Sequence, residues 1–445
     1  MKLKSSYSQI LKLSAPIMIG SAAQNIVAIT DSIFLYHLDE LDFAAIGFAS
    51  IFFLIISAIS YGFSRGGQIL VARKAGALAY SDASKSFYAM LYFHLALAIG
   101  FFIFIKWYSG GFFQWFIDSE SILEKSTAYL DYRAYGVFPS FVGLALIGFY
   151  TGIARTRIIM YDTVVLIVVN IFLNYSLIFG KFGFPAMGIA GAGLASTLAE
   201  VVALGVFSIY MFFDKGLRRF QMFRFYKLDL SVVRQNIKIG SPVVIQAVVG
   251  LGSWFFFFGV IENYGAHALA VSNLVRVVYL IVSVPCWGYS VAINTLVSNL
   301  IGQEKTELVF PAIIKTVKIC MTSTVIVALP VLLFPQRILY PVLGSEDMSL
   351  FSEAQPIFYV LFFILFLFSI GSVLYNGMVG TGAIRWSLII QTSCSLLYVL
   401  LVYIGVNYFE VSLVEAWAIE ILYWIPMIFF IRQYLIKGTW KKLQV

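Results

Sequence analysis

Long apolar segments recur along the whole chain, and each is long enough to cross a lipid bilayer. Hydrophobic residues make up 61% of the 445 residues and charged residues only 12%, with a mean hydropathy of +0.91. Soluble domains average about 45–50% apolar and about 25% charged residues, so lipid must cover much of this surface. A span needs roughly 20 apolar residues. The twelve predicted spans are 10–36, 43–72, 86–106, 127–153, 160–180, 187–213, 235–261, 267–300, 310–334, 355–381, 386–407 and 413–434.

The predicted spans are helices, because the sequence shows no alternating strand pattern and a helix satisfies its own backbone hydrogen bonds in lipid. We therefore predict an all-α integral membrane protein with twelve transmembrane helices. The first apolar run ends in the acidic segment 39–42, with no small-residue cleavage site behind it. We expect this run to be retained as a span and not removed as a signal peptide.

Basic residues are concentrated in alternate loops, which sets the predicted orientation. The set of loops that contains both chain ends holds 23 of the 30 Lys and Arg residues, and segment 214–240 is its longest member. The opposite set holds five basic residues, which are Lys106, Lys125, Arg133, Lys181 and Arg337. We predict a bacterial-type plasma (inner) membrane location with both termini cytoplasmic. The basic clusters are expected to face lipid and not nucleic acid.

The two halves of the chain repeat one another. Pro16 in the first span has its counterpart in Pro242 of the seventh, and Gly152 after the fourth span has its counterpart in Gly380 after the tenth. Each half holds six spans, and an even number gives both halves the same orientation, as in transporters with a parallel repeat. The predicted domains are an N-terminal lobe at 1–213, a cytoplasmic linker at 214–234 and a C-terminal lobe at 235–445.

Several motifs follow one another in a specific order. In the first span, Asp31 lies fifteen residues after Pro16. Spans 5 and 6 carry Asn170-Ile171-Phe172-Leu173-Asn174, Leu177-Ile178-Phe179-Gly180 and the glycine-rich segment 185–197, and the second half adds Ala268-Leu269-Ala270 and Val379-Gly380-Thr381-Gly382. Over nearly the whole chain, this order resembles the multidrug and toxic compound extrusion (MATE) family of antiporters. The resemblance implies export of amphipathic, often cationic, organic compounds by alternating access, driven by inward Na⁺ or H⁺.

The chain also departs from the family pattern. The acids that some members carry in spans 7 and 10 are missing, and these spans offer Gln246 and Asn376 in their place. In span 5, Asn174 stands where some relatives have Asp. The losses in spans 7 and 10 favour ion coupling in the N-terminal lobe over the C-terminal lobe.

Polar side chains in spans 1, 5 and 6 are the candidate ion-coupling residues. Asp31 lies deep in the first span, where a carboxylate is costly, so it is expected to face the bundle interior or a wet cavity. Asn170 and Asn174 share one helical face, and Thr197 and Glu200 share another. Each has a structural alternative, namely hydrogen bonding between neighbouring helices.

These side chains suit either of two coupling ions. Asp31, Asn170, Asn174 and Thr197 supply the kinds of oxygen ligand that a hard cation such as Na⁺ prefers. Alternatively, Asp31 and Glu200 exchange a proton in the same pocket. We expect no cofactor apart from the coupling ion, Na⁺ or H⁺.

Candidates for the substrate cleft rest on a weaker signal, because aromatic faces attract organic cations but many aromatic residues simply face lipid. The candidates are Gln24, Gln246, Trp254, Asn273 and Asn376. Glu420 is the only clear intramembrane acid of the C-terminal lobe, and Arg276 is its candidate partner. A structural role is the alternative for Glu420.

Other function classes fit the sequence less well. A lipid-linked saccharide flippase is the alternative function, but it would be expected to line its cleft with several basic residues, and the spans here contribute only Arg65 and Arg276. A channel or receptor is less consistent with the repeat, and an ATP-driven pump would need a phosphate-binding loop that is missing. No nucleophile–base arrangement indicates an enzyme. The expected partners are small organic substrates and membrane lipid, without nucleic acid, and the protein is expected to function as a monomer.

Overall fold

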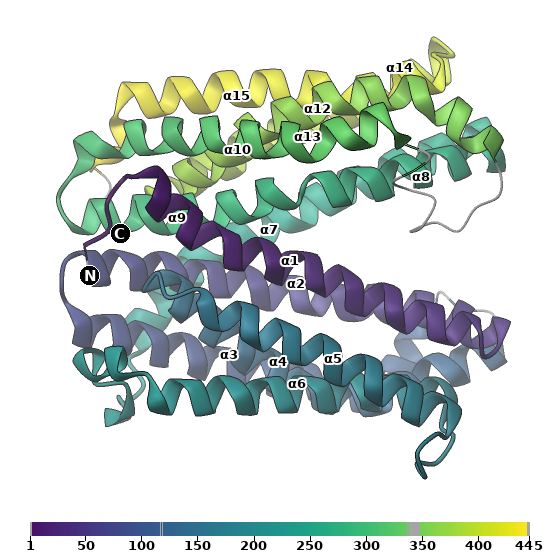
Figure 1. The fold of residues 1–445 in the computed structure, drawn as a ribbon, viewed down its shortest axis with the longest axis horizontal. Helices are drawn as coiled ribbons and strands as arrows, with labels where there is room; N and C mark the ends of the chain where they lie inside the picture. The colour runs from purple at the N-terminus through teal and green to yellow at the C-terminus, as the bar shows by residue number, and fades with distance from the viewer. Residues whose placement is uncertain (1, 116, 118, 336, 338–347, 443–445) are drawn as a thin grey trace. The chain divides into compact units, whose positions relative to one another are not determined.

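The computed structural model describes residues 2–115, 117, 119–335, 337 and 348–442, and every regular element among them is a helix (Figure 1). The α-helices are α1 (Tyr7–Tyr36), α2 (Glu40–Gly76), α3 (Tyr80–Phe113), α4 (Glu120–Gly152), α5 (Arg157–Phe179), α6 (Gly188–Phe213), α7 (Leu230–Ile261), α8 (Ala266–Val282), α9 (Val284–Gly302), α10 (Val309–Leu333), α12 (Met348–Gly380), α13 (Ile384–Tyr408), α14 (Leu413–Ala418) and α15 (Glu420–Lys437). The described ranges also contain the short 3₁₀ helices η1 (Lys215–Phe220), η2 (Met222–Arg224), η3 (Glu262–Tyr264), η4 (Thr306–Leu308) and η5 (Thr439–Lys442).

Ten helical stretches in the described part of the chain are long and apolar enough to cross a membrane, and a bent pair brings the number to 11. The bent pair is α8 and α9, which meet at 44° within the predicted span 267–300. Pro285 at the start of α9 explains the break, because proline cannot donate the backbone hydrogen bond that a continuous helix needs. The remaining predicted span, 10–36, lies within α1, where the side chains of residues 22–29 are outside the described part.

The helices divide into two compact units. Unit 1 contains residues 19–244, and unit 2 contains residues 2–18 together with the described residues from 245 onward. This division differs from the predicted lobes at 1–213 and 235–445, because residues 2–18 pack with the second unit and residues 214–244 pack with the first. The two crossing points fall after Met18 in α1 and after Val244 in α7, two residues beyond Pro16 and Pro242 respectively, so they occupy equivalent positions of the repeat.

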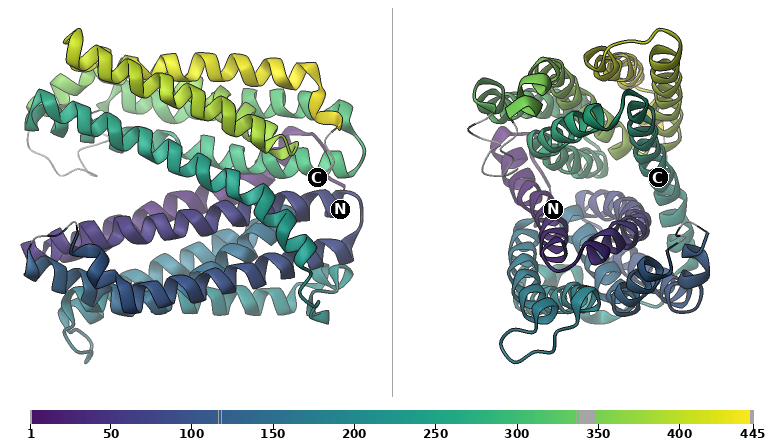
Figure 2. Two further views of the ribbon diagram at one scale, coloured as in Figure 1. Left: turned by 180° about the vertical axis from the view of Figure 1, so that it is seen from behind. Right: turned by 90° about the vertical axis from the view of Figure 1, so that its right-hand side faces the viewer.

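Each unit is built around one central helix. In unit 1, α4 packs against α2, α3 and α6, and α5 packs against α6 (Figure 1). In unit 2, α12 packs against α8, α9, α10 and α15 (Figure 2). Because α4 and α12 contain the fourth and tenth predicted spans, the two units place equivalent spans at their centres.

Close helix contacts confirm the repeat inside each unit. A Cβ added at Gly152 would lie 3.0 Å from the backbone oxygen of Gln68, and a Cβ at Gly380 would lie 2.7 Å from that of Asn294. Gln68 and Asn294 have the same spacing in the chain as Pro16 and Pro242, so the two contacts are equivalent. Glycine is needed at both places, since any side chain would push the helices apart.

Candidate functional site

Four polar side chains of unit 1 form one buried hydrogen-bond network. Asn174 donates from Nδ2 to Asp31 Oδ1 at 2.5 Å and to Asn170 Oδ1 at 3.1 Å. Ser196 Oγ donates to Asp31 Oδ2 at 3.1 Å and accepts from Asn170 Nδ2 at 3.0 Å. All four side chains are buried, and Asp31 is only 8% exposed. The network therefore joins α1, α5 and α6 through a carboxylate that is shielded from solvent.

One oxygen of this network has no hydrogen-bond partner. Asn174 Oδ1 is buried and accepts no bond, although an unsatisfied buried polar atom costs about 1–3 kcal/mol. The Asp31 carboxylate, the two amide oxygens and the Ser196 hydroxyl are the oxygen types that a hard cation prefers. The residues present therefore fit a small cation that would take Asn174 Oδ1 as one of its ligands.

Close packing of α5 against α6 brings these side chains together. Asn170 and Asn174 are one helical turn apart on α5, so both point the same way. A Cβ added at Gly191 on α6 would lie 2.6 Å from the backbone oxygen of Leu177 on α5. The missing side chain lets α6 approach α5 closely enough for Ser196 to reach Asn170 and Asp31.

Thr197 does not take the place that the sequence predicts for it. Its hydroxyl donates to the backbone oxygen of Tyr132 at 3.1 Å. The neighbouring residue, Ser196, makes the contacts to Asp31 and Asn170 instead. Neighbouring residues of a helix point about 100° apart. The sequence analysis therefore predicted the correct turn of α6, but the residue of that turn that faces Asp31 is Ser196 and not Thr197.

Glu200 forms an ion pair that the sequence analysis missed. Arg133 of α4 donates to both oxygens of Glu200, each at 2.7 Å, and its guanidinium lies 3.8 Å from the centre of the Phe53 ring. The assignment of Arg133 to an outer loop is wrong, because α4 begins at Glu120 and buries this residue against α2 and α6. A bidentate pair satisfies the carboxylate fully. Glu200 is thus compensated by the protein, whereas Asp31 is not paired with a cation in the described residues.

Asp162 is a further carboxylate of unit 1 that the sequence analysis did not single out. It lies on α5, five residues after Arg157, and is half-buried. No salt bridge involves it among the described residues. It lies two helical turns before Asn170 and outside the network around Asp31.

In unit 2, Glu420 is buried among aromatic side chains. Its Oε1 accepts hydrogen bonds from the Tyr279 hydroxyl at 3.1 Å and from Trp424 Nε1 at 3.0 Å. Arg276, the predicted partner, is exposed and lies 5.2 Å from the centre of the Phe258 ring. No salt bridge to Glu420 occurs within the described ranges. The pairing of Glu420 with Arg276 is therefore wrong for this structure.

The predicted cleft residues of unit 2 make different local contacts, and their role in a substrate cleft stays a prediction. Gln246 donates to Ser387 Oγ at 2.9 Å, and Asn376 donates to a backbone oxygen of its own helix at 2.9 Å. Trp254 packs edge-on against Tyr279 with ring centres 4.9 Å apart, and Asn273 is half-buried on α8. The Gln24 side chain lies outside the described part.

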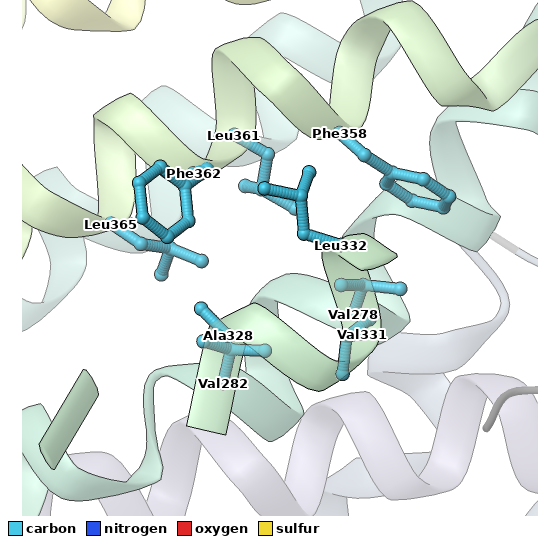
Figure 3. Close-up of a pocket in the computed structure, with 9 residues that line it drawn as sticks. All are labelled: Val278, Val282, Ala328, Val331, Leu332, Phe358, Leu361, Phe362 and Leu365. Carbon is cyan, nitrogen blue, oxygen red and sulfur yellow. The ribbon is translucent and has the colours of Figure 1, made fainter. Parts of the chain in front are cut away.

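A small pocket in unit 2 is purely apolar. Side chains of α8, α10 and α12 line it, among them Val278, Ala328 and Phe362 (Figure 3). None of its lining residues can bind a cation or orient a polar ligand. This pocket therefore reflects imperfect packing of apolar helices and does not extend the candidate site.

The model of the family described as MatE matches the chain twice, over residues 16–176 and 242–404. The chain belongs to the MatE family. The two matched segments begin at Pro16 and at Pro242, the paired prolines of the repeat, so each copy of the repeat matches the family by itself. This confirms both the resemblance and the twelve-helix, two-lobe fold class that the sequence predicts, and a MatE protein is an integral membrane protein.

Curated relatives and solved structures agree with this membership. The chain is 26% identical to a probable multidrug resistance protein NorM of Thermotoga maritima over 416 residues, which cover 92% of this chain and 88% of the relative. It is also 26% identical to one of Synechocystis sp. over 343 residues, covering 76% and 74%. A crystal structure of a MATE protein in complex with MaL6 superposes with a TM-score of 0.88 at 21% identity, covering 98% and 97%. At that identity the superposition shows the fold alone.

Proposed function

We propose that this MatE protein is a secondary active multidrug efflux antiporter, which exports amphipathic and cationic organic compounds in exchange for Na⁺ or H⁺. The family membership and the multidrug resistance names of the relatives support the efflux part. Exchange with an ion is supported by one observation. In the described part of the chain, the buried Asp31 carboxylate has no ion pair, and it lies beside Asn174 Oδ1, which has no hydrogen-bond partner. We further propose that it acts as a monomer in a bacterial-type inner membrane with both termini cytoplasmic.

A cation at Asp31 would couple ion binding to the conformation of the protein. An empty, charged Asp31 is costly to seal between dry helices, whereas an occupied or protonated one is neutral. The ion therefore binds the closed arrangement of α1, α5 and α6 more tightly than the open one. A ligand with such differential affinity shifts the balance between the two states, and this shift is what alternating access requires.

The contacts of Glu200 and Asp31 support Asp31 as the residue that carries the ion. Arg133 holds both oxygens of Glu200, so a proton on Glu200 would have to break a bidentate ion pair. Within the described residues, Asp31 has no ion pair and accepts hydrogen bonds from the neutral donors Asn174 and Ser196, and Arg133 acts on it only through space. Asp31 is therefore the proposed carrier for either ion, with the Asn170 and Asn174 amides and the Ser196 hydroxyl as additional ligands when the ion is Na⁺.

Transport by purified protein in proteoliposomes tests this proposal. A Na⁺ gradient and a pH gradient are imposed separately, and movement of a cationic dye is measured for the wild-type chain and for Asp31→Asn. One gradient is expected to drive dye transport by the wild type, and neither is expected to drive it with Asp31→Asn. The matched control is Asp131→Asn, because Asp131 is an exposed carboxylate of the same unit, 60% accessible. A wild-type rate of dye transport that changes with neither the Na⁺ gradient nor the pH gradient would contradict the antiport proposal.

The flippase alternative gains no support from the site. A flippase for a phosphorylated lipid would be expected to present several basic side chains from its spans. The additional buried cation that the structure reveals, Arg133, is held by Glu200. Unchanged accumulation of a broad panel of cationic dyes in cells that hold the protein in the membrane would favour the flippase.

A further inference from the structure

The segment between α6 and α7 packs against unit 1 and is not an extended linker without contacts. We call residues 214–229 the strap. Side chains along the N-terminal part of α3 hydrogen-bond to it: Ser84 Oγ donates to the Phe220 oxygen at 2.6 Å, Tyr88 to the Met222 oxygen at 2.6 Å, and Tyr92 to the Tyr226 oxygen at 3.0 Å. Ser81 adds a hydrogen bond to the Tyr226 hydroxyl at 3.0 Å. The strap is thus fixed along three turns of one helix.

The inner face of the strap is a small hydrophobic core. Leu217, Phe220 and Met222 are buried against unit 1. At the start of the strap, Asp214 forms an ion pair with Arg155 and caps η1 through the backbone nitrogen of Gly216 at 2.9 Å. These contacts determine which side chains of the strap are left to point outward.

Most outward side chains of the strap and its two flanks are basic or apolar, and the exceptions are Gln221 and Asp229. The exposed basic residues are Lys215, Arg218, Arg219, Arg224 and Lys227. The exposed apolar residues are Phe212, Phe213, Phe223, Phe225, Leu228 and Leu230. Phe225 is 74% exposed and Phe213 is 73% exposed. Asp229 at the end of the strap is the one exposed acid of segment 212–230, all of which the structure describes.

The outer face of the strap is expected to lie at the surface of the bilayer. The strap follows the last residue of α6 and precedes the first of α7, so it lies at one end of two membrane-spanning helices. Basic side chains there attract the negative headgroups of a leaflet, and exposed aromatic rings insert at the headgroup level. We propose that the outer face of the strap is a docking surface for anionic lipid headgroups of the membrane.

Local lipid composition around the strap tests the proposal. The full-length protein carries Leu228→Cys in every variant, and a fluorophore is attached there, because the three native cysteines are buried. The protein is reconstituted in phosphatidylcholine vesicles that contain a trace of quencher-labelled phosphatidylglycerol or, separately, quencher-labelled phosphatidylcholine. The ratio of the two quenching efficiencies measures the preference of the strap for the anionic lipid. The labelled protein with all basic residues of the strap intact is expected to show a clear preference for phosphatidylglycerol that falls at high salt.

Two variants, each with four basic residues neutralised, test whether the lipid preference depends on the charges of the strap. Neutralising Lys215, Arg218, Arg224 and Lys227 to Gln is expected to lower the preference about tenfold or more. The control neutralises Lys2, Lys4, Lys12 and Arg385, which are exposed and are predicted to lie on the same side of the membrane. The control should keep the preference. Equal loss in both variants, or no loss in the first, would overturn the proposal. The readout does not involve transport, so it is independent of the coupling ion.

Discussion

Among the described residues, each unit buries a carboxylate that has no ion pair, Asp31 in unit 1 and Glu420 in unit 2, and their surroundings differ. Asp31 of unit 1 is held by two amides and a hydroxyl, and one amide oxygen beside it is unsatisfied. Glu420 of unit 2 is held by a tyrosine and a tryptophan. Two amides and a hydroxyl offer several oxygen ligands to a cation, whereas around Glu420 the Tyr279 hydroxyl offers one and the Trp424 indole N–H offers none. The surroundings of Asp31 therefore support the proposed ion site in unit 1, whereas those of Glu420 favour a structural role in unit 2.

The repeat allows this comparison to be made position by position. Phe257 is the counterpart of Asp31 at an offset of 226, and Asn170 lies opposite 396–398, with Tyr398 at the offset of 228 that relates Gly152 to Gly380. Phe257 and Tyr398 stack with ring centres 6.3 Å apart, and both are buried. Counterparts of a polar network thus meet as an aromatic pair. The two copies of the repeat therefore differ in the chemistry of these contacts, which are polar in unit 1 and aromatic in unit 2.

Loss of the Asp31 charge is expected to have the largest effect on function. Asp31→Asn keeps the size of the side chain and a hydrogen-bonding amide, but it cannot carry a cation or a proton. In a pump-deficient bacterium, we expect this variant to accumulate cationic dye as strongly as cells without the protein, at equal membrane levels of variant and wild type. Near-normal dye exclusion by Asp31→Asn would break the assignment of coupling to unit 1.

Removing Arg133 is expected to cause the largest loss of stability. Arg133→Gln leaves Glu200 buried without its partner, and breaking a buried pair costs up to about 3–5 kcal/mol. We expect somewhat less, because Glu200 is 17% exposed. The double variant Arg133→Gln and Glu200→Gln should recover part of the loss, since no unpaired charge remains. Thermal unfolding of the purified protein measures both, and equal stability of single and double variants would contradict the ion pair.

Truncating Asn174 is expected to weaken coupling without abolishing it. Asn174→Ala removes the donor to Asp31 and the unsatisfied oxygen, but leaves Asn170 and Ser196 in place. We expect the cation concentration for half-maximal efflux to rise about tenfold, which corresponds to about 1.4 kcal/mol. Titration of the driving ion in proteoliposomes measures this shift. A change in maximal rate at an unaltered cation requirement would show that Asn174 is not a ligand.

Substituting Glu420 is expected to have the smallest effect. Glu420→Gln retains an oxygen that accepts from Tyr279 and Trp424, so efflux should stay within about twofold of wild type. Dye efflux and thermal unfolding are measured together on this variant. A stable Glu420→Gln protein that no longer transports would show that unit 2 also takes part in coupling.

The sequence allowed the fold and part of the site to be predicted for physical reasons that can be named. Polar residues in apolar spans must find partners, so Asp31, Asn170 and Asn174 stood out and do meet. Ser196 did not stand out, because a short hydroxyl next to Thr197 gives no sign of which one faces the neighbouring helix. Arg133 is a basic residue near the end of a predicted span, and such residues usually extend toward the headgroups.

Other differences come from packing, which hydropathy does not encode. The assignment of residues 2–18 to unit 2 rests on contacts such as that of Leu3 with Asn299, where the backbone nitrogen donates to Oδ1 at 3.0 Å. The docking of the strap on α3 rests on hydrogen bonds to its backbone. Partners of this kind are more than a hundred residues apart in the chain, so no local pattern could have paired them.

Movement of the ion itself tests the central claim most directly. Proteoliposomes are loaded with a cationic dye gradient, and the opposite flux is followed with radioactive sodium and with an internal pH indicator for wild type, Asp31→Asn and Glu420→Gln. The account predicts a dye-driven flux of one ion in the wild type and in Glu420→Gln, and none in Asp31→Asn. Ion flux that persists in Asp31→Asn and disappears in Glu420→Gln would contradict it and would place coupling in the other unit.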